Sequence, residues 1–383
     1  MRSLAALLFC VLCACARGVP SPEPATGPMR AIWITRWDYR SLEDVERIVE
    51  HCADAGFDTL MFQVRGNATA FYPSSFEPWA EQLGWCNPGF DPLAVALAEA
   101  RRRGLALHAW VNVMPAWWGP RPPADPTHVI HTHPEWLWID GDGERQSYSE
   151  RFYVSLNPCL PEVRDYLVAV LGELLERYAL DGLHLDYIRF PNESPAVRPG
   201  QDFPRDQRTL ALYRAASGLA PDDDAQSWDR WRAEQVTELV RALARTRDRL
   251  RPTAELSAAV GPELRAALSH HQDWGRWIDE GLLDRVFPMN YTADEERFTQ
   301  RMEAWSAHAA RLPVVMGLRA TSVDPARLIE RMRRCERSLA GFGVFMYAEL
   351  FDCRNTVIDS QTPERSRERA ACRAAILPHL QGP

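Results

Sequence analysis

The sequence lacks the short motifs that mark several common enzyme classes. It has no glycine-rich loop of the GxGxxG or GxxxxGK type, which argues against a nucleotide-binding sheet. It has no GxSxG, the motif that presents a nucleophilic serine in many hydrolases. Beyond residue 15 it also has no CxxC, and the cysteines and histidines there do not follow the spacing of a zinc site.

Long apolar runs and an excess of basic charge are absent too. The run from Leu4 to Leu12 is too short to span a bilayer as a mature helix. A net charge of −8 over 383 residues argues against nucleic acid as the main partner. The hydrophobic content of 46% can fill a large core. The 14 Trp and 10 Tyr offer flat faces that suit sugar rings, although core packing explains them equally well.

The N-terminus has the pattern of a targeting segment, because Arg2 precedes the short apolar run. The run ends in Leu12-Cys13-Ala14-Cys15, which resembles a bacterial lipobox whose last cysteine receives lipid. Cleavage nearby by an ordinary signal peptidase is the alternative. We expect residues 1–15 to be a lipoprotein signal peptide, residues 16–28 a Pro-rich tether and residues 29–383 the folded domain. The chain would then be exported and anchored through Cys15, facing the periplasm on the outer membrane.

Six cysteines remain beyond the lipobox-like run, and an oxidising compartment would allow some of them to pair. They are Cys52, Cys86, Cys159, Cys335, Cys353 and Cys372. We expect Cys86 and Cys159 to be close enough to bridge, because both lie in loops predicted on the same side of the fold.

The stretch from Asp181 to Pro191 is the most informative part of the chain. As a strand it would place Gly182, His184 and Asp186 on one face and apolar side chains on the other. Asp181 would lie about 16 Å from Asp186, too far to act on the same bond. The pattern is typical of the inner wall of a parallel barrel, with Asp186 at the mouth.

Strand-like and helix-like segments alternate along the whole chain. Such alternation favours a parallel sheet, and eight units favour a (β/α)₈ barrel over the alternative, a doubly wound open sheet. Extended loops are expected after the second, third and fourth strands. The eight strands are predicted at residues 30–35, 57–64, 105–113, 182–187, 255–260, 285–290, 313–318 and 341–347.

The carboxyl ends of these strands define the expected active face. They carry Asp38, Arg65, Asn67, Asn112, Asp186, Arg189, Glu263, Asn290, Tyr291 and Glu349. No strand end groups histidines with carboxylates as a metal site would, and His131 and His133 fit a surface loop. Two carboxylates on a polar, aromatic-lined face suit glycoside hydrolysis, in which one acts as acid and the other as base or nucleophile.

Several motifs resemble those of the glycosyl-hydrolase-like family 10 domain over roughly residues 28–350. The similar segments are Arg30-Ala31-Ile32-Trp33-Ile34, Phe62-Gln63-Val64-Arg65-Gly66-Asn67, His108-Ala109-Trp110-Val111-Asn112, Leu156-Asn157-Pro158, Asp181 to Pro191, and Pro288-Met289-Asn290-Tyr291-Thr292. The resemblance implies a barrel glycosidase of bacterial envelopes. Some relatives cleave peptidoglycan glycan strands, notably those stripped of peptide.

Catalytic roles follow from the strand ends. Asp186 is the first predicted catalytic carboxylate, ionised beside Arg189 and oriented by His184. Glu263 and Glu349 are the candidates for the second, with Glu263 preferred because it follows a neighbouring strand; Asp38 and Asp273 are further candidates. The predicted substrate-binding residues are Gln63, Arg65, Asn67, Trp110, Asn112, His184, Tyr187, Arg189, Asn290 and Tyr291.

The predicted activity is therefore a metal-independent, cofactor-free glycoside hydrolase acting on an envelope polysaccharide. A non-catalytic glycan-binding lipoprotein on the same barrel is one alternative. A metal-dependent deacetylase or other hydrolase is another.

Overall fold

Eight parallel strands form the wall of a barrel at the centre of the molecule. The computed structural model describes residues 27–191, 203–354 and 362–382. The strands are β1 (Met29–Ile34), β2 (Thr59–Gly66), β4 (Ala106–Asn112), β7 (Gly182–Asp186), β8 (Glu255–Val260), β9 (Arg285–Pro288), β10 (Met316–Arg319) and β11 (Gly341–Phe345). Their order runs from β10 through β11 and β1 to β9, and parallel bridges at Val286–Val314 and Met289–Gly317 join β9 to β10. The ring is thus nearly closed, and the predicted (β/α)₈ fold is confirmed.

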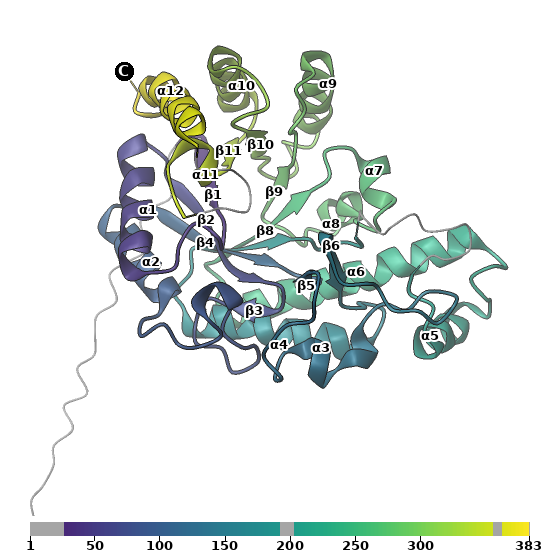
Figure 1. Cartoon of the computed structure of the whole chain (residues 1–383). Helices are drawn as coiled ribbons and strands as arrows, with labels where there is room; N and C mark the ends of the chain where they lie inside the picture. Colours follow the sequence, from purple (N-terminus) through teal and green to yellow (C-terminus); the bar gives the residue numbers. More distant parts are fainter. Residues whose placement is uncertain (1–26, 192–202, 355–361, 383) are drawn as a thin grey trace, which may run out of the picture.

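Helices surround the strands (Figure 1). They are α1 (Leu42–Ala55), α2 (Pro92–Arg102), α4 (Pro161–Arg177), α6 (Ala225–Leu250), α7 (Leu264–Leu268), α8 (Trp274–Asp279), α9 (Glu295–Ser306), α10 (Pro325–Ser338), α11 (Tyr347–Leu350) and α12 (Pro363–Leu380). Helix α1 illustrates how the sequence determines where a helix begins and ends. Ser41 and Asp44 form a capping box at its start, and Gly56 ends it with a left-handed φ of 91°.

Side chains of the strands alternate between an outer and an inner apolar layer. Leu183 and Leu185 of β7 belong to the large outer cluster that packs beneath the helices. The inner cluster fills the barrel and consists of Ala31, Trp33, Met61, Trp110, Phe287, Val315, Met346 and Ala348. His184 lies inside as well, with its ring centroid 4.8 Å from that of Phe287. The predicted division into two faces is confirmed for residues 182–186, whereas Tyr187, expected on the outer face with the leucines, lines a cavity at the mouth of the barrel.

The three long loops extend from β2, β4 and β7 as expected, and the first two contain structure that the sequence did not predict. The first holds β3 (Thr69–Ala70) and the short 3₁₀ helix η1 (Glu81–Leu83). The second holds an antiparallel hairpin of β5 (Pro115–Gly119) and β6 (Ser149–Ser155), together with α3 (Val129–Thr132) and η2 (Pro134–Trp136). The third holds α5 (Gln207–Ser217). The hairpin was missed because β5 is short and contains Pro and two Trp, and because β6 does not alternate in polarity.

The segment Leu264–Glu280 divides into α7 and α8, with His271 between them at a left-handed φ of 56°. One local expectation needs correction. The expected bridge between Cys86 and Cys159 is wrong, since both thiols are free. Cys86 is exposed and contacts the carbonyl of Leu83, whereas Cys159 is buried before α4. The other four cysteines of the folded domain are also free.

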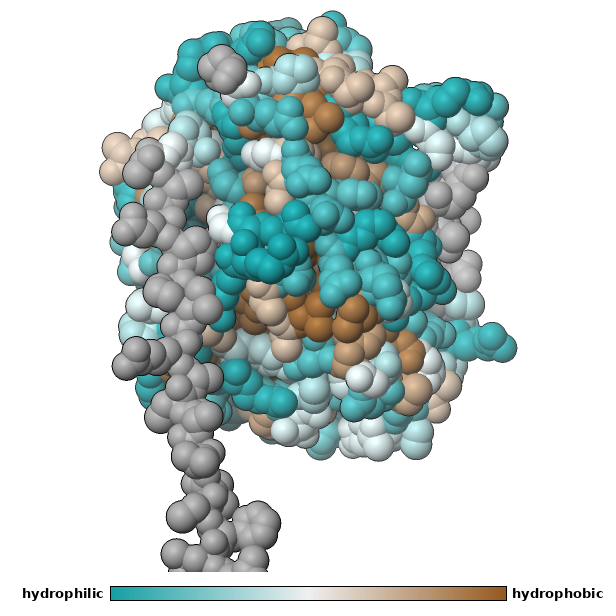
Figure 2. All heavy atoms as spheres, turned by 90° about the vertical axis from the view of Figure 1, so that its left-hand side faces the viewer, coloured by the Kyte–Doolittle hydropathy of each residue, from teal (hydrophilic) through white to brown (hydrophobic). Residues whose placement is uncertain are grey.

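Figure 2 shows the side of the molecule that carries α1, where hydrophilic residues predominate around smaller hydrophobic areas. This agrees with the burial pattern of α1, whose exposed positions include Glu43, Glu46 and Glu50. Within residues 27–191, 203–354 and 362–382, no helix is long and apolar enough to cross a membrane. The predicted signal peptide, Cys15 and most of the tether lie outside the described residues.

Candidate active site

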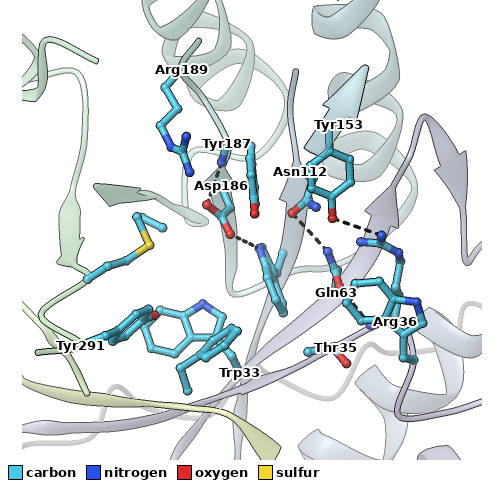
Figure 3. Close-up of a pocket in the computed structure, with 15 residues that line it drawn as sticks. Trp33, Thr35, Arg36, Gln63, Asn112, Tyr153, Asp186, Tyr187, Arg189 and Tyr291 are labelled. Carbon is cyan, nitrogen blue, oxygen red and sulfur yellow. Dashed lines mark hydrogen bonds between the residues drawn. The ribbon is translucent and has the colours of Figure 1, made fainter. Parts of the chain in front are cut away.

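Asp186 lies at the mouth of the barrel, where β7 ends (Figure 3). Its carboxylate accepts a hydrogen bond of 3.2 Å from Nε1 of Trp110 and one of 2.7 Å from the backbone amide of Tyr187. The side chain is nearly buried, with 7% of its surface exposed. Burial raises the pKa of Asp186 above that of an ordinary aspartate, while the charge of Arg189 and the two hydrogen bonds lower it. The combined effect is a raised pKa of Asp186.

Asp186 faces a cavity with a volume of about 180 Å³. This is below the ~300–1,000 Å³ of sites that enclose a whole drug-sized ligand, so the cavity suits one part of an extended substrate. Seven of its 15 lining residues are aromatic, and polar or charged groups lie between them. The lining residues are Trp33, Thr35, Arg36, Trp37, Gln63, Trp110, Asn112, Tyr153, Asp186, Tyr187, Arg189, Ala259, Met289, Tyr291 and Phe345.

A row of hydrogen bonds joins the ends of β1, β2 and β4 beside Asp186. Nε2 of Gln63 donates to Oδ1 of Asn112 over 3.1 Å, and Oε1 of Gln63 accepts from the amide of Arg36 over 3.0 Å. In register, Asn112 is the β4 neighbour of Asp186. The two amide side chains are therefore fixed in orientation, and both line the cavity.

Tyr187 and Arg189 form the wall of the cavity next to Asp186. Tyr187 has a left-handed φ of 50°, which ends β7 and turns its ring toward the cavity instead of the outer face. The guanidinium of Arg189 lies 4.7 Å from the centre of that ring. The ring of Tyr153, from the β5–β6 hairpin, meets Tyr187 edge to face at 5.1 Å.

Tyr291 lies across the cavity and stacks on Phe345 with ring centroids 5.4 Å apart. Burial raises the pKa of Tyr291 well above its ordinary value, and the charges of Asp186 and Glu349 raise it further. Its hydroxyl is therefore protonated at neutral pH and available as a hydrogen-bond donor.

His184 does not orient Asp186, in contrast to the expectation from the sequence. Its Nε2 accepts a hydrogen bond of 3.2 Å from Trp33, and its Nδ1 lies 2.9 Å from the hydroxyl of Ser257. Burial lowers the pKa of His184 well below 6.5, so the ring is neutral. The histidine supports the floor of the site through Trp33, which itself lines the cavity.

Besides His184, three predicted substrate-binding residues lie outside the cavity lining. Arg65 forms a buried ion pair of 2.6 Å with Glu77 and donates to the backbone carbonyl of Asn112. Asn67 accepts a hydrogen bond from Arg36, and Asn290 donates to the carbonyl of Phe298. Each of the three positions a strand end or a loop beside the cavity.

The predicted partner carboxylates are not brought next to Asp186. Glu263 is 47% exposed and pairs with Arg301 at 2.7 Å, beside a separate surface groove. Glu349 is nearly buried on α11, where it pairs with Arg319 at 2.9 Å and accepts from the amide of Thr321.

The two further candidates have structural roles. Asp38 accepts from the amide of Thr35, and Asp273 caps α8. Among the described residues that line the cavity, Asp186 is the single carboxylate.

The sequence reasoning missed a group of lining residues. Arg36 and Trp37 follow β1 directly, and their position at a strand end was a usable signal. Tyr153 carried no such signal, because its hairpin was not predicted. The remaining unpredicted lining residues are Trp33, Thr35, Ala259, Met289 and Phe345.

A metal-binding cluster is not found in the described part of the chain, where no three His, Cys, Asp or Glu side chains gather suitably. His131 hydrogen-bonds the carbonyl of Pro123, and His133 stacks on Trp136 with ring centroids 3.8 Å apart. The two histidines are therefore engaged separately.

Comparisons with known proteins place this site within a family. The model of the family "Glycosyl hydrolase-like 10" matches residues 28–330. The glycosyl hydrolase DigH of Escherichia coli (strain K12) is 27% identical over 382 residues, covering 84% of this chain and 79% of DigH. The glycosyl hydrolase YngK of Bacillus subtilis (strain 168) is 25% identical over 296 residues, covering 69% of this chain and 54% of YngK.

A solved structure shows the same fold at low sequence identity. The glycoside hydrolase domain of PgaB (BpsB) from Bordetella bronchiseptica superposes with a TM-score of 0.61 at 15% identity, covering 91% of this chain and 98% of that domain. The family model spans most of the present chain, and the barrel places its strand-end motifs around one cavity. The chain therefore belongs to the glycosyl hydrolase-like 10 family.

Proposed function

We propose that this protein hydrolyses glycosidic bonds in a cell-envelope polysaccharide, with peptidoglycan glycan strands as the substrate. The observation that carries the proposal is Asp186, a buried carboxylate at a strand end in an aromatic-lined cavity. Two relatives named glycosyl hydrolases support the reaction class. The family resemblance and the lipobox-like N-terminus favour an envelope substrate.

Asp186 is assigned the role of proton donor to the leaving oxygen. A glycosidase acid must hold its proton near neutral pH, and burial raises the pKa of Asp186 in that direction. This differs from the expectation of an ionised Asp186 in a polar environment. The indole of Trp110 and the amide of Tyr187 fix the carboxyl group toward the cavity.

Glu349 has the better claim to be the second carboxylate. Its charge reaches the cavity, since it raises the pKa of Tyr291 together with Asp186. Glu263 instead faces a surface groove and pairs with Arg301. We therefore assign the role of second carboxylate to Glu349, which follows β11, instead of to Glu263, which follows β8.

The substitution Asp186→Asn tests the proposal. We expect it to lower kcat by about a hundredfold to ten-thousandfold, the usual contribution of a general acid, and to leave the melting temperature and glycan binding nearly unchanged. Glu349→Gln should lower kcat strongly, whereas Glu263→Gln should leave it near the wild-type value. Products released from peptidoglycan, with and without stem peptides, would be measured by mass spectrometry, with and without a chelator. Turnover by Asp186→Asn near the wild-type rate would contradict the assignment.

A second candidate function is glycan binding without catalysis. It is favoured by one observation, that neither predicted partner carboxylate lines the cavity in the described residues. The same experiment separates the two functions, because a binding protein would retain glycans and release no products in the unsubstituted form.

We further propose that the protein is exported and held on the membrane by a lipid on Cys15, facing the periplasm. The support is the sequence Leu12-Cys13-Ala14-Cys15 after a short apolar run. A lipid anchor would place the barrel next to an envelope polysaccharide. The Pro-rich residues 16–28 would act as an extended spacer.

A further inference from the structure

Arg36 is a buried cation with unused hydrogen-bond donors beside the cavity. Its side chain is fully buried, and it lines the cavity after β1. Nη2 donates to Oδ1 of Asn67 and to the hydroxyl of Tyr153, each over 3.2 Å. Nε and Nη1 have no partner. Among the described residues, no carboxylate forms an ion pair with Arg36, whereas Arg65 on the next strand pairs with Glu77.

An unpaired buried charge is costly, and a fold normally supplies a counter-ion or removes the charge. Neighbouring residues instead hold this guanidinium in place without a counter-ion. The guanidinium lies 4.0 Å from the ring centre of Trp37. Gly66 leaves room for it, since a Cβ at that position would lie 2.8 Å from both Cδ and Cζ of Arg36. Buried donors that lack partners at a functional site indicate a missing acceptor.

Basic side chains outnumber acidic ones in the cavity lining, although the whole chain carries a net charge of −8. Arg36 and Arg189 line the cavity together with the carboxyl group of Asp186. Figure 3 shows Arg36 on the far side of the Gln63–Asn112 pair from Asp186. An anion next to Arg36 would therefore sit beside the position of bond cleavage without occupying it.

We infer that Arg36 is a specificity-determining residue that binds a carboxylate carried by the substrate sugar, so that the site prefers an acidic glycan. This inference rests on the proposed function and deepens it. Two kinds of sugar carry such a group: one with a free carboxylate on an ether side chain, as in glycan strands stripped of peptide, and a uronic acid, in which the carboxylate is on the ring. In the first kind, an amide bond to peptide removes the charge that Arg36 recognises.

Binding measurements on the Asp186→Asn protein, which leaves substrates intact, test the inference. Three oligosaccharide probes would be titrated by calorimetry: peptide-free peptidoglycan glycans, the same glycans with their carboxylates coupled to methylamine, and oligogalacturonate. The first should bind about tenfold to a hundredfold more tightly than its amide, the range expected for charge-assisted hydrogen bonds. Tight binding of oligogalacturonate instead would identify the ring carboxylate as the ligand. Equal dissociation constants for the free and amidated glycans, with weak oligogalacturonate binding, would overturn the inference.

Substitutions assign the preference to Arg36. In the same background, Arg36→Gln should bind the free acid as weakly as the amide, and Arg36→Lys should restore part of the difference. A purely structural Arg36 would weaken both probes equally. If Arg36→Gln does not fold, Tyr153→Phe removes one of the two acceptors that hold the guanidinium and should reduce the preference about twofold to fivefold. An unchanged preference in Tyr153→Phe and in any folded Arg36 variant would contradict the assignment.

The inference and the proposed function can fail separately. Hydrolysis of free and amidated glycans at equal rates would retain the function and reject the role of Arg36. A binding preference without hydrolysis by the unsubstituted protein would retain the role of Arg36 and reject the function.

Discussion

Asp186 is held between two opposing influences on its pKa. Removal from water favours the neutral acid, while the positive charge of Arg189 favours the carboxylate. Trp110 and Tyr187 contribute hydrogen bonds that also favour the carboxylate. Because the proposed role requires the proton, activity should be present below the pKa of Asp186 and lost as the pH rises through it.

Arg189→Gln should move the alkaline limb of the pH profile to higher pH. The substitution removes a positive charge that lowers the pKa of Asp186. The pKa should therefore rise, and the acid should keep its proton up to a pH about one unit higher. The pH dependence of kcat/KM for glycan hydrolysis measures the shift. Arg276→Gln, at a surface position on α8, is the matched control and should leave the profile unchanged. A limb that moves to lower pH would contradict the proton-donor role.

The element that positions the site, β7, depends on its smallest residue. Gly182 lies on the inner face of the barrel beside the buried ring of His108. A Cβ on Gly182 would lie 2.6 Å from two carbon atoms of that ring, closer than packed atoms approach. Glycine here allows two strands to share the narrow lower part of the barrel, while His184 and Asp186 continue the same face upward.

Gly182→Ala should therefore destabilise the fold by about 1–3 kcal/mol, the usual cost of overpacking a core. Gly172→Ala is a matched control in the interior of α4, where a Cβ would meet Thr246 at 3.4 Å, an ordinary contact. Because alanine favours helices, the control should be neutral or stabilising by up to ~1 kcal/mol. Urea unfolding followed by circular dichroism gives both free energies. Equal changes in the free energy of unfolding for the two substitutions would show that the contact with His108 does not require glycine at position 182.

At the scale of the whole molecule, the loops after β2, β4 and β7 all leave the same end of the barrel. Through Tyr153, the hairpin of β5 and β6 places an aromatic ring against Tyr187 and a hydroxyl against Arg36. The opposite end carries the turns that begin the strands, where Asp181 accepts from the amide of Leu107 over 2.9 Å. The candidate site and this structural support thus lie at opposite ends of the barrel, as in other barrels of this kind.

The proposed lipid anchor would determine where in the cell the whole protein acts. Cys15→Ser should move the protein from the membrane fraction to the soluble fraction, because it removes the thiol that would carry lipid. Fractionation followed by immunoblotting measures the distribution. Cys86→Ser is the control, since it alters an exposed thiol of the folded domain. A Cys15→Ser protein that stays membrane-bound, or an unsubstituted protein without lipid, would contradict the lipoprotein proposal.

The sequence by itself determined the features that depend on local patterns. Eight alternating units predicted the barrel, and Ser41 and Gly56 marked the ends of α1. The period of two along β7 placed Asp186 at the mouth and His184 inside. These predictions succeed because capping, turn formation and side-chain alternation depend on residues a few positions apart.

Only the tertiary structure decided which side chains share the cavity. Arg36 meets Tyr153, 117 positions away, and no local pattern indicates that contact. Glu263 and Glu349 both follow strand ends, yet Arg301 draws one to the surface and Arg319 holds the other on α11. Ion pairs and hydrogen bonds between distant segments select among carboxylates that look equivalent in the sequence. The sequence therefore indicates which strand-end residues reach the mouth of the barrel, and long-range partners decide which of them line the cavity.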